Sequence, residues 1–160
     1  MKFRVGFGFD VHQLVEHRDF ILGGIKVEHT KGALGHSDAD VLIHAICDAL
    51  LGAANMGDIG KHFPDTSNEF KNIDSKILLA RTVALIRSKG YEISNIDSTV
   101  CLQKPKIKPY IETMTAVLAK TMEIPEEDLS IKATTTEKLG YVGREEGVSA
   151  YATVLIYRTN

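Results

Sequence analysis

Hydrophobic and polar positions alternate first with the period of a strand and then with the period of a helix. Residues 5–9 place Val and Phe at every second position between glycines, as a β-strand does. Two short apolar runs surround Gly23-Gly24 within Phe20–Val27, which is typical of a hairpin. Gly32–Gly35 has neither pattern and is predicted to be a loop.

The first helical pattern is predicted to run from Ser37, as N-cap, to Gly52, as C-terminal stop. Asp38 and Asp40 follow Ser37 and would lie in the first turn, where the helix dipole favours acidic side chains. His44 and Asp48 are four residues apart, with Asp40 one turn earlier, so the three share one helix face. That face is polar and differs from the apolar stripe of the same helix.

The remaining segments complete an α+β pattern. The expected elements are a loop at Gly57–Thr66, helices at 74–90 and 109–124, strands at 91–102, 129–134 and 148–157, and turns at 134–138 and 140–144. This order predicts a mixed β-sheet with helices on one face. The other sheet face needs a cover, and a second subunit is the most economical one, so we expect an oligomer.

Composition narrows the class of protein. A chain of 160 residues predicts a single domain over 1–160. With 44% hydrophobic and 25% charged residues and a formal charge of -2, it resembles a soluble globular protein, which argues against non-specific nucleic-acid binding. We find no signal-peptide, transit or membrane-spanning pattern and expect a cytoplasmic protein without a membrane partner. Cys47 and Cys101 are interpreted as reduced packing residues rather than a disulfide.

Candidate metal ligands lie at the end of the first strand. A period of two directs Asp10 and His12 to one strand face, where both could bind one ion. A D-x-H pair alone is weak evidence, because a surface acid beside a half-buried histidine is the commoner case. His44 would complete three ligands with an open fourth position, the pattern of a zinc site that contacts substrate. On spacing alone, His44 is equally interpreted as a helix-surface histidine.

Other polar clusters leave two interpretations open. His36 beside a helix N-terminus could bind an anion or lie in a solvated turn. Thr134–Thr136 with Glu137 offers hydroxyls for phosphate and a carboxylate for a hard cation, but it is also an ordinary strand end. Lys106 could meet a diphosphate or be solvated, and Arg144 beside two glutamates is most simply a surface charge cluster. No Walker A loop, G-x-G-x-x-G loop or nucleophile elbow is present.

Several motifs together resemble the 2-C-methyl-D-erythritol 2,4-cyclodiphosphate synthase family over nearly the whole chain. They are Gly8-Phe9-Asp10-Val11-His12, Gly35-His36-Ser37-Asp38-Ala39-Asp40 with His44, Gly57-Asp58-Ile59-Gly60, Phe63-Pro64-Asp65-Thr66, Pro105-Lys106 and Lys132-Ala133-Thr134-Thr135-Thr136-Glu137-Lys138. The resemblance implies a homotrimer, with sheets packed around the three-fold axis and sites between adjacent subunits. It also implies a phosphorus-oxygen lyase that turns 4-diphosphocytidyl-2-C-methyl-D-erythritol 2-phosphate into the cyclic diphosphate and CMP.

The resemblance also implies roles for individual residues. Asp10, His12 and His44 resemble the ligands of Zn2+, and Glu137 resembles the ligand of a second divalent cation, Mg2+ or Mn2+, bound with the substrate diphosphate. His36 and Thr135 resemble transition-state stabilisers. The implied substrate contacts are Asp10, His12, His36, Ser37, Asp58, Ile59, Gly60, Phe63, Pro64, Asp65, Thr66, Ser67, Leu102, Pro105, Lys106, Ile107, Lys108, Thr134, Thr135, Thr136, Glu137, Tyr141 and Arg144.

Two positions depart from the family pattern. Lys104 and Tyr141 stand where other members carry smaller or apolar residues, which puts the cytosine loop and the axial cavity in question. The resemblance implies that this cavity, lined by Arg144, can hold an isoprenoid diphosphate. Two other classes stay open beside the synthase. A zinc phosphohydrolase would use the same ligands with a metal-bound water, and a non-catalytic zinc module would need a fourth protein ligand.

Overall fold

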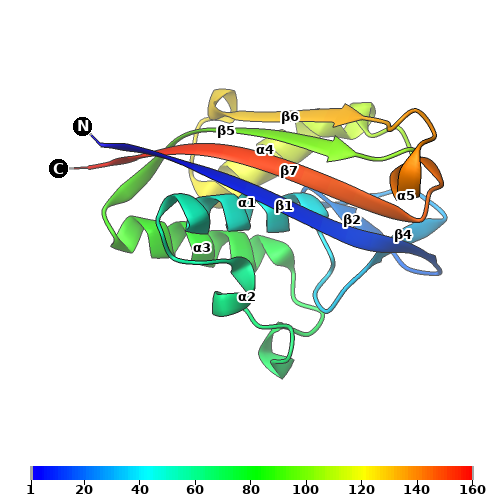
Figure 1. The fold of residues 1–160 in the computed structure, drawn as a ribbon, viewed down its shortest axis with the longest axis horizontal. Coiled ribbons are helices and arrows are strands. Elements are labelled where there is room, and N and C mark those ends of the chain that lie inside the picture. Colours follow the sequence, from blue (N-terminus) through cyan, green and yellow to red (C-terminus); the bar gives the residue numbers. More distant parts are fainter. Residues whose placement is uncertain (1, 160) are drawn as a thin grey trace.

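Two long antiparallel strands, β1 (Phe3–Glu16) and β7 (Gly147–Arg158), lie at the centre of the structure, a computed structural model that describes residues 2–159 (Figure 1). They pair from Phe3 with Tyr157 to Gln13 with Gly147. Beside them, β4 (Lys31–Leu34), β5 (Tyr91–Cys101) and β6 (Leu129–Thr134) complete a sheet in the order β4-β1-β7-β5-β6. Only β5 and β6 are parallel, so the sheet is mixed, as predicted.

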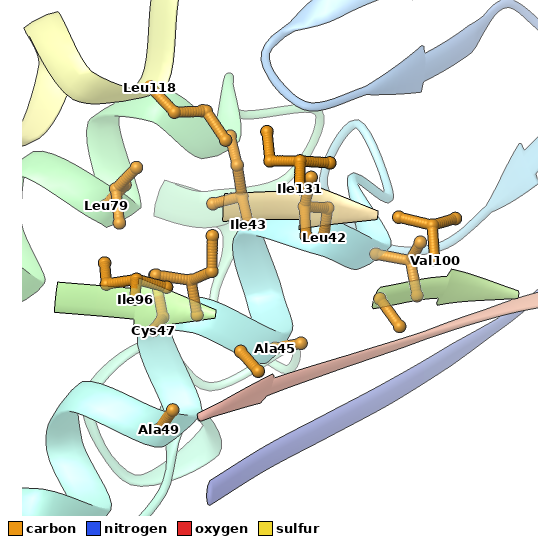
Figure 2. Close-up of a cluster of buried hydrophobic side chains, with 14 of the residues drawn as sticks. Leu42, Ile43, Ala45, Cys47, Ala49, Leu79, Ile96, Val100, Leu118 and Ile131 are labelled. Atoms are coloured by element: carbon orange, nitrogen blue, oxygen red, sulfur yellow. The ribbon is translucent and has the colours of Figure 1, made fainter. Parts of the chain in front are cut away.

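Helices cover one face of this sheet. The other elements are the hairpin strands β2 (Phe20–Leu22) and β3 (Ile25–Val27), and the helices α1 (Val41–Ala53), α2 (Ile59–His62), α3 (Ser75–Ser88), α4 (Ile111–Met122) and α5 (Gly140–Gly143). Helix α1 contacts β1 and β7, α3 packs beside α1 and against β5, and α4 packs beside α3 and against β6. Figure 2 shows the resulting core, where Leu42 and Ile43 of α1 meet Leu118 of α4 and Ile96 and Ile131 of the sheet.

Helix α1 lies unusually close to β1 because two glycines of the strand face it. A Cβ atom at Gly8 would overlap the carbonyl oxygen of Ala45, and one at Gly6 would overlap that of Ala49. Any larger side chain at these positions would push the helix away from the sheet. The glycines that alternate with apolar residues in β1 are therefore required for α1 to pack on the inner face of the sheet.

A buried carboxylate fixes where α1 begins. Asp40 is 0% exposed and is the N-cap, with Oδ1 accepting from the backbone N–H of Ile43 at 3.1 Å. It also accepts from the N–H groups of Gly23 at 3.0 Å and Gly24 at 2.7 Å, in the turn of the β2–β3 hairpin. Three backbone donors thus satisfy a charge that burial would otherwise penalise. One side chain joins the hairpin to the helix.

Several local predictions were wrong. Helix α1 begins after Asp40 rather than after Ser37, because Asp40 caps the helix. Asp38 therefore lies outside the helix. Gly32–Gly35 is largely strand β4, whose pairing with β1 overrides the local glycines. The predicted loop and turn at 57–66 and 140–144 contain the short helices α2 and α5. The other predicted helices and strands are confirmed within a few residues.

The outer sheet face is apolar along β1 and polar toward β6. Phe3, Val5, Phe7, Phe9 and Val11 are all exposed there, with Phe7 at 63% exposure. On the β5–β6 side, the same face carries an ion pair between Lys132 and Asp97 at 2.8 Å. Such a continuous apolar strip is unusual on the surface of a monomeric soluble protein.

Both cysteines are free thiols, as predicted, and burial raises the pKa of Cys47 to about 12. Of the helices in residues 2–159, none is both long and apolar enough to cross a membrane.

The contact between β1 and α1 gives a stability prediction. Replacing Gly8 with Ala should lower the free energy of unfolding by about 3 kcal/mol, because the added methyl group meets helix backbone that cannot move aside cheaply. Gly52→Ala is the matched control, since nothing lies within 4 Å of a Cβ there and Ala favours the helix by up to ~1 kcal/mol. Urea denaturation of both variants measures the difference. Equal stability of the two would show that the close packing is not a constraint.

Candidate functional site

Three potential metal ligands converge where α1 crosses β1. Asp10 and His12 point to the same inner face of β1, and His44 approaches from the second turn of α1. Asp10 Oδ2 lies 2.9 Å from His12 Nε2 and 3.1 Å from His44 Nδ1, and the two nitrogens are 3.2 Å apart. Ligands about 2.0 Å from a tetrahedral zinc ion are about 3.3 Å from one another. The donor set therefore fits a divalent metal ion, with room for further ligands on the open side.

Hydrogen bonds orient His12 for this role. His12 Nδ1 lies 3.0 Å from the carbonyl oxygen of Leu34, which can only accept. The proton of a neutral ring therefore sits on Nδ1, and the lone pair on Nε2 points toward Asp10 and His44. The short strand β4, which supplies Leu34, thereby orients one ligand of the site.

The local charges keep Asp10 ionised. Burial raises its pKa, but when the two rings are protonated their hydrogen bonds and charges outweigh burial and bring the pKa of Asp10 to about 2. With both rings neutral, as metal binding requires, the site offers one carboxylate and two imidazoles, a combination suited to a divalent cation.

A pocket of about 500 Å³ opens beside His12 and His44. Its lining includes most of the predicted substrate contacts between residues 36 and 66, namely His36, Ser37, Ile59, Gly60, Phe63, Pro64, Asp65 and Thr66. Gly35 of the same motif also lines it, as do Phe70 and Leu78, which the sequence did not indicate. His36 Nε2 donates to the carbonyl oxygen of Ser67 at 2.8 Å, which fixes the ring against the loop. Asp58 caps α2 through Lys61 N at 2.9 Å.

The predicted substrate contacts at 102–108 and 134–135 line a different pocket, of about 670 Å³. It is lined by Leu102, Gln103, Lys104, Pro105, Lys106, Ile107, Lys108, Ala133, Thr134 and Thr135, and by His29, which the sequence did not indicate. His29 follows the β2–β3 hairpin, so only tertiary packing brings it here.

Within one chain the two pockets are separate and share no lining residue. Asp10 pairs with Ala150, which in turn pairs with Val100 of β5. Val100 pairs with Ala133 at the second pocket. Three strand spacings put Asp10 about 14 Å from Ala133. A single copy therefore does not bring the two groups of residues together.

The remaining candidates lie at the end of β6 and beyond it. Glu137 is exposed, with a positive φ of 54°, and is not among the ligand atoms that converge with Asp10. Thr136 and Tyr141 line a cavity of about 270 Å³ with Cys101. Arg144 pairs with Glu146 at 2.7 Å, and both side chains are exposed, so in the single chain it belongs to a surface charge cluster.

A further acid positions the short helix beside the first pocket. Asp48 lies one turn after His44, and its Oδ1 accepts from the backbone N–H of Ile59 at 3.2 Å. Burial raises the pKa of Asp48, although this hydrogen bond opposes the shift. The polar face that the sequence predicted on this helix therefore serves two purposes, since His44 points to the ligand cluster and Asp48 holds the start of α2.

Comparisons with known proteins agree over almost the full length. The model of the YgbB family matches residues 3–157. The 2-C-methyl-D-erythritol 2,4-cyclodiphosphate synthase of Bacteroides fragilis is 70% identical over 158 residues, which cover 99% of each chain. The bifunctional IspDF of Campylobacter jejuni superposes with a TM-score of 0.96 at 42% identity, covering 99% of this chain and 43% of that one. A CDP complex of Plasmodium falciparum IspF has a TM-score of 0.86 at 34% identity, covering 99% and 97%.

The hydrogen bond from Ile59 to Asp48 gives a local prediction. In Asp48→Ala the Ile59 amide should exchange with solvent at least about tenfold faster, because a lost hydrogen bond of about 1.4 kcal/mol corresponds to that factor. Asp48→Asn keeps an acceptor oxygen and should exchange like the wild type. Hydrogen exchange followed by NMR compares the two variants. If Asn behaves like Ala, charge rather than the hydrogen bond holds α2.

Proposed function

The chain belongs to the YgbB family, and from this premise we propose that the pocket beside Asp10, His12 and His44 is the active site of a 2-C-methyl-D-erythritol 2,4-cyclodiphosphate synthase. The enzyme converts 4-diphosphocytidyl-2-C-methyl-D-erythritol 2-phosphate into 2-C-methyl-D-erythritol 2,4-cyclodiphosphate and CMP. The observation that carries this proposal is the convergence of three ligand atoms beside a pocket, in a chain 70% identical to a synthase of that name.

The reaction is an intramolecular phosphoryl transfer. An oxygen of the substrate's own 2-phosphate attacks the β-phosphorus, the bond to the bridging oxygen of CMP breaks, and CMP leaves with that oxygen. The attacking oxygen is already ionised near neutral pH, so no strong general base is needed. The main barrier is repulsion between anions, and holding both groups in one closed pocket removes the entropic cost of bringing them together.

The chain's residues have distinct tasks. Asp10, His12 and His44 would hold Zn2+ and Glu137 would hold Mg2+ or Mn2+, and these ions supply positive charge to the meeting phosphates. His36, fixed by Ser67, and Thr135 stabilise the transferring group. The loop from Phe63 to Ser67 encloses the methylerythritol part, while Asp58 and Gly60 meet the ribose.

The second pocket takes the cytidine. Its wall, formed by Leu102–Lys108 and Thr134–Thr135, combines apolar side chains with lysines, which suits a nucleobase linked to a diphosphate. The related Plasmodium falciparum protein has been solved as a CDP complex, which supports a cytidine diphosphate-linked substrate.

We further propose that three copies assemble and share their active sites. The separation of about 14 Å within one chain, estimated from three strand spacings, supports an arrangement in which the cytidine pocket of one copy faces the metal ligands of its neighbour. The apolar strip from Phe3 to Val11 gives the sheets a surface to bury around a three-fold axis. Arg144 and Tyr141 then line an axial cavity that can hold an isoprenoid diphosphate. The trimer works in the cytoplasm.

A phosphorus NMR assay with the cytidyl substrate tests the reaction. Wild-type protein should produce a cyclic diphosphate and CMP, whereas His44→Ala should lose most of its zinc, measured by elemental analysis, and nearly all turnover. His17→Ala alters an exposed histidine that does not line this pocket and should keep both. A hydrolysed monophosphate in place of the ring would identify a phosphohydrolase, and wild-type zinc in His44→Ala would disprove that ligand.

Subunit mixing tests the shared site. Inactive His44→Ala chains and inactive Glu137→Gln chains are unfolded, mixed equally and refolded. A site is intact only when its zinc half and its Glu137 half both escape the lesion, so random assortment should restore roughly a quarter of the sites. Size exclusion confirms that trimers re-form. Refolded trimers with no activity above that of the parent variants would show that each site is built within one subunit.

A further inference from the structure

A buried hydroxyl connects His44 to a carboxylate outside the ligand cluster. Ser75, the first residue of α3, is 0% exposed, and its Oγ lies 2.9 Å from His44 Nε2. The same Oγ donates to Asp38 Oδ1 at 2.5 Å. Ser75 also donates its backbone N–H to Asp38 Oδ2 at 3.0 Å, so both carboxylate oxygens bind this one residue.

We infer that Asp38 and Ser75 form a relay that holds His44 in the tautomer required for metal binding. The hydroxyl of Ser75 has one proton, and the carboxylate of Asp38 can only accept it. Ser75 Oγ must therefore accept from His44, which places the ring proton on Nε2. The lone pair of His44 is then on Nδ1, the atom that lies 3.1 Å from Asp10. Asp38 and Ser75 are positioning residues because they act through His44.

The fold keeps the relay rigid. Asp38 donates its backbone N–H to Ile73 O at 3.1 Å, and His36 accepts from Asn72 N at 2.8 Å. The segment before α1 is thus joined to the segment before α3 by two backbone hydrogen bonds, which place Asp38 beside Ser75. Rotation of the Ser75 hydroxyl away from His44 would also break its hydrogen bond to Asp38.

Ser37 is a second hydroxyl near the same nitrogen but has a different environment. Its Oγ lies 3.2 Å from His44 Nε2, and it also accepts from Ala39 N at 3.1 Å. Ser37 lines the pocket, whereas Ser75 is sealed in the interior and is anchored by a carboxylate. The geometry therefore assigns the fixed acceptor for His44 to Ser75 and leaves Ser37 able to face a bound ligand.

This relay rests on the proposed metal site, and zinc affinity measures it directly. Partners that orient a ligating histidine typically change metal affinity by about 10–100-fold. Competition with a chromophoric chelator should therefore show zinc binding to Ser75→Ala and to Asp38→Asn weakened by about this factor. Because the loss is in affinity, kcat at saturating zinc should return close to the wild-type value, which a misfolded site could not do.

The controls separate the relay from a general structural effect. Asp74→Asn alters the exposed N-cap of the same helix without touching Ser75 Oγ and should bind zinc like the wild type. In the relay Asp38 acts on His44 through Ser75, so the Ser75→Ala/Asp38→Asn double variant should bind zinc no more weakly than Ser75→Ala alone. If the loss of zinc affinity in the double variant equals the product of the losses in the two single variants, the two residues act independently and the relay is wrong.

The failure of the relay and the failure of the metal site give different results. If His44→Ala loses zinc while Ser75→Ala and Asp38→Asn bind it as tightly as the wild type, the relay is wrong and the metal site stands. If His44→Ala itself binds zinc normally, the proposed site is wrong and the relay falls with it. Circular dichroism at the assay temperature confirms that each variant is folded, and Asp38→Asn, whose parent residue is only half-buried, tests the relay should Ser75→Ala not fold.

Discussion

The close seating of α1 on β1 is the constraint on which the candidate site depends. Gly6 and Gly8 remove the side chains that would otherwise hold the helix away from the strand. Only at this distance can His44 reach Asp10 and His12, whose ligand atoms lie 3.1 and 3.2 Å from its Nδ1. The glycines that let α1 pack closely and the ligands Asp10 and His12 therefore lie within the same few residues of β1. A change in the packing of α1 would also move His44 relative to these ligands.

Three aspartates around α1 carry out different structural tasks. Asp40 caps the helix and joins it to the hairpin, Asp48 holds the start of α2 at the pocket, and Asp38 binds Ser75 behind His44. Each carboxylate accepts from backbone or hydroxyl donors supplied by another segment. Because hydrogen bonds to charged acceptors are stronger than neutral ones, these contacts act together with the packing on β1 to fix the position of the helix.

Within one copy, the residues proposed for the active site are divided between two separate pockets. One pocket contains the metal ligands, the other contains the basic and apolar wall proposed for cytidine, and no residue lines both. The outer sheet face carries exposed aromatic side chains along β1, such as Phe7. The same assembly would bury this strip and join the pockets, so stability and catalysis would both depend on contacts between copies.

The sequence by itself determined the mixed α+β pattern, most strands and helices, and the common face of Asp10 and His12, because a strand's period of two is a local property of the backbone. Motif resemblance correctly indicated the family, which the comparisons confirm. Spacing left His44 undecided between ligand and surface residue, since only the docking of α1 on β1 brings it to Asp10. The start of α1 was misplaced because Ser37 and Asp40 are both good caps, and the choice between them depends on Gly23 and Gly24 in the distant hairpin. Ser75 had no local signal, because it meets His44 across 31 residues of sequence, and only tertiary structure makes such a contact.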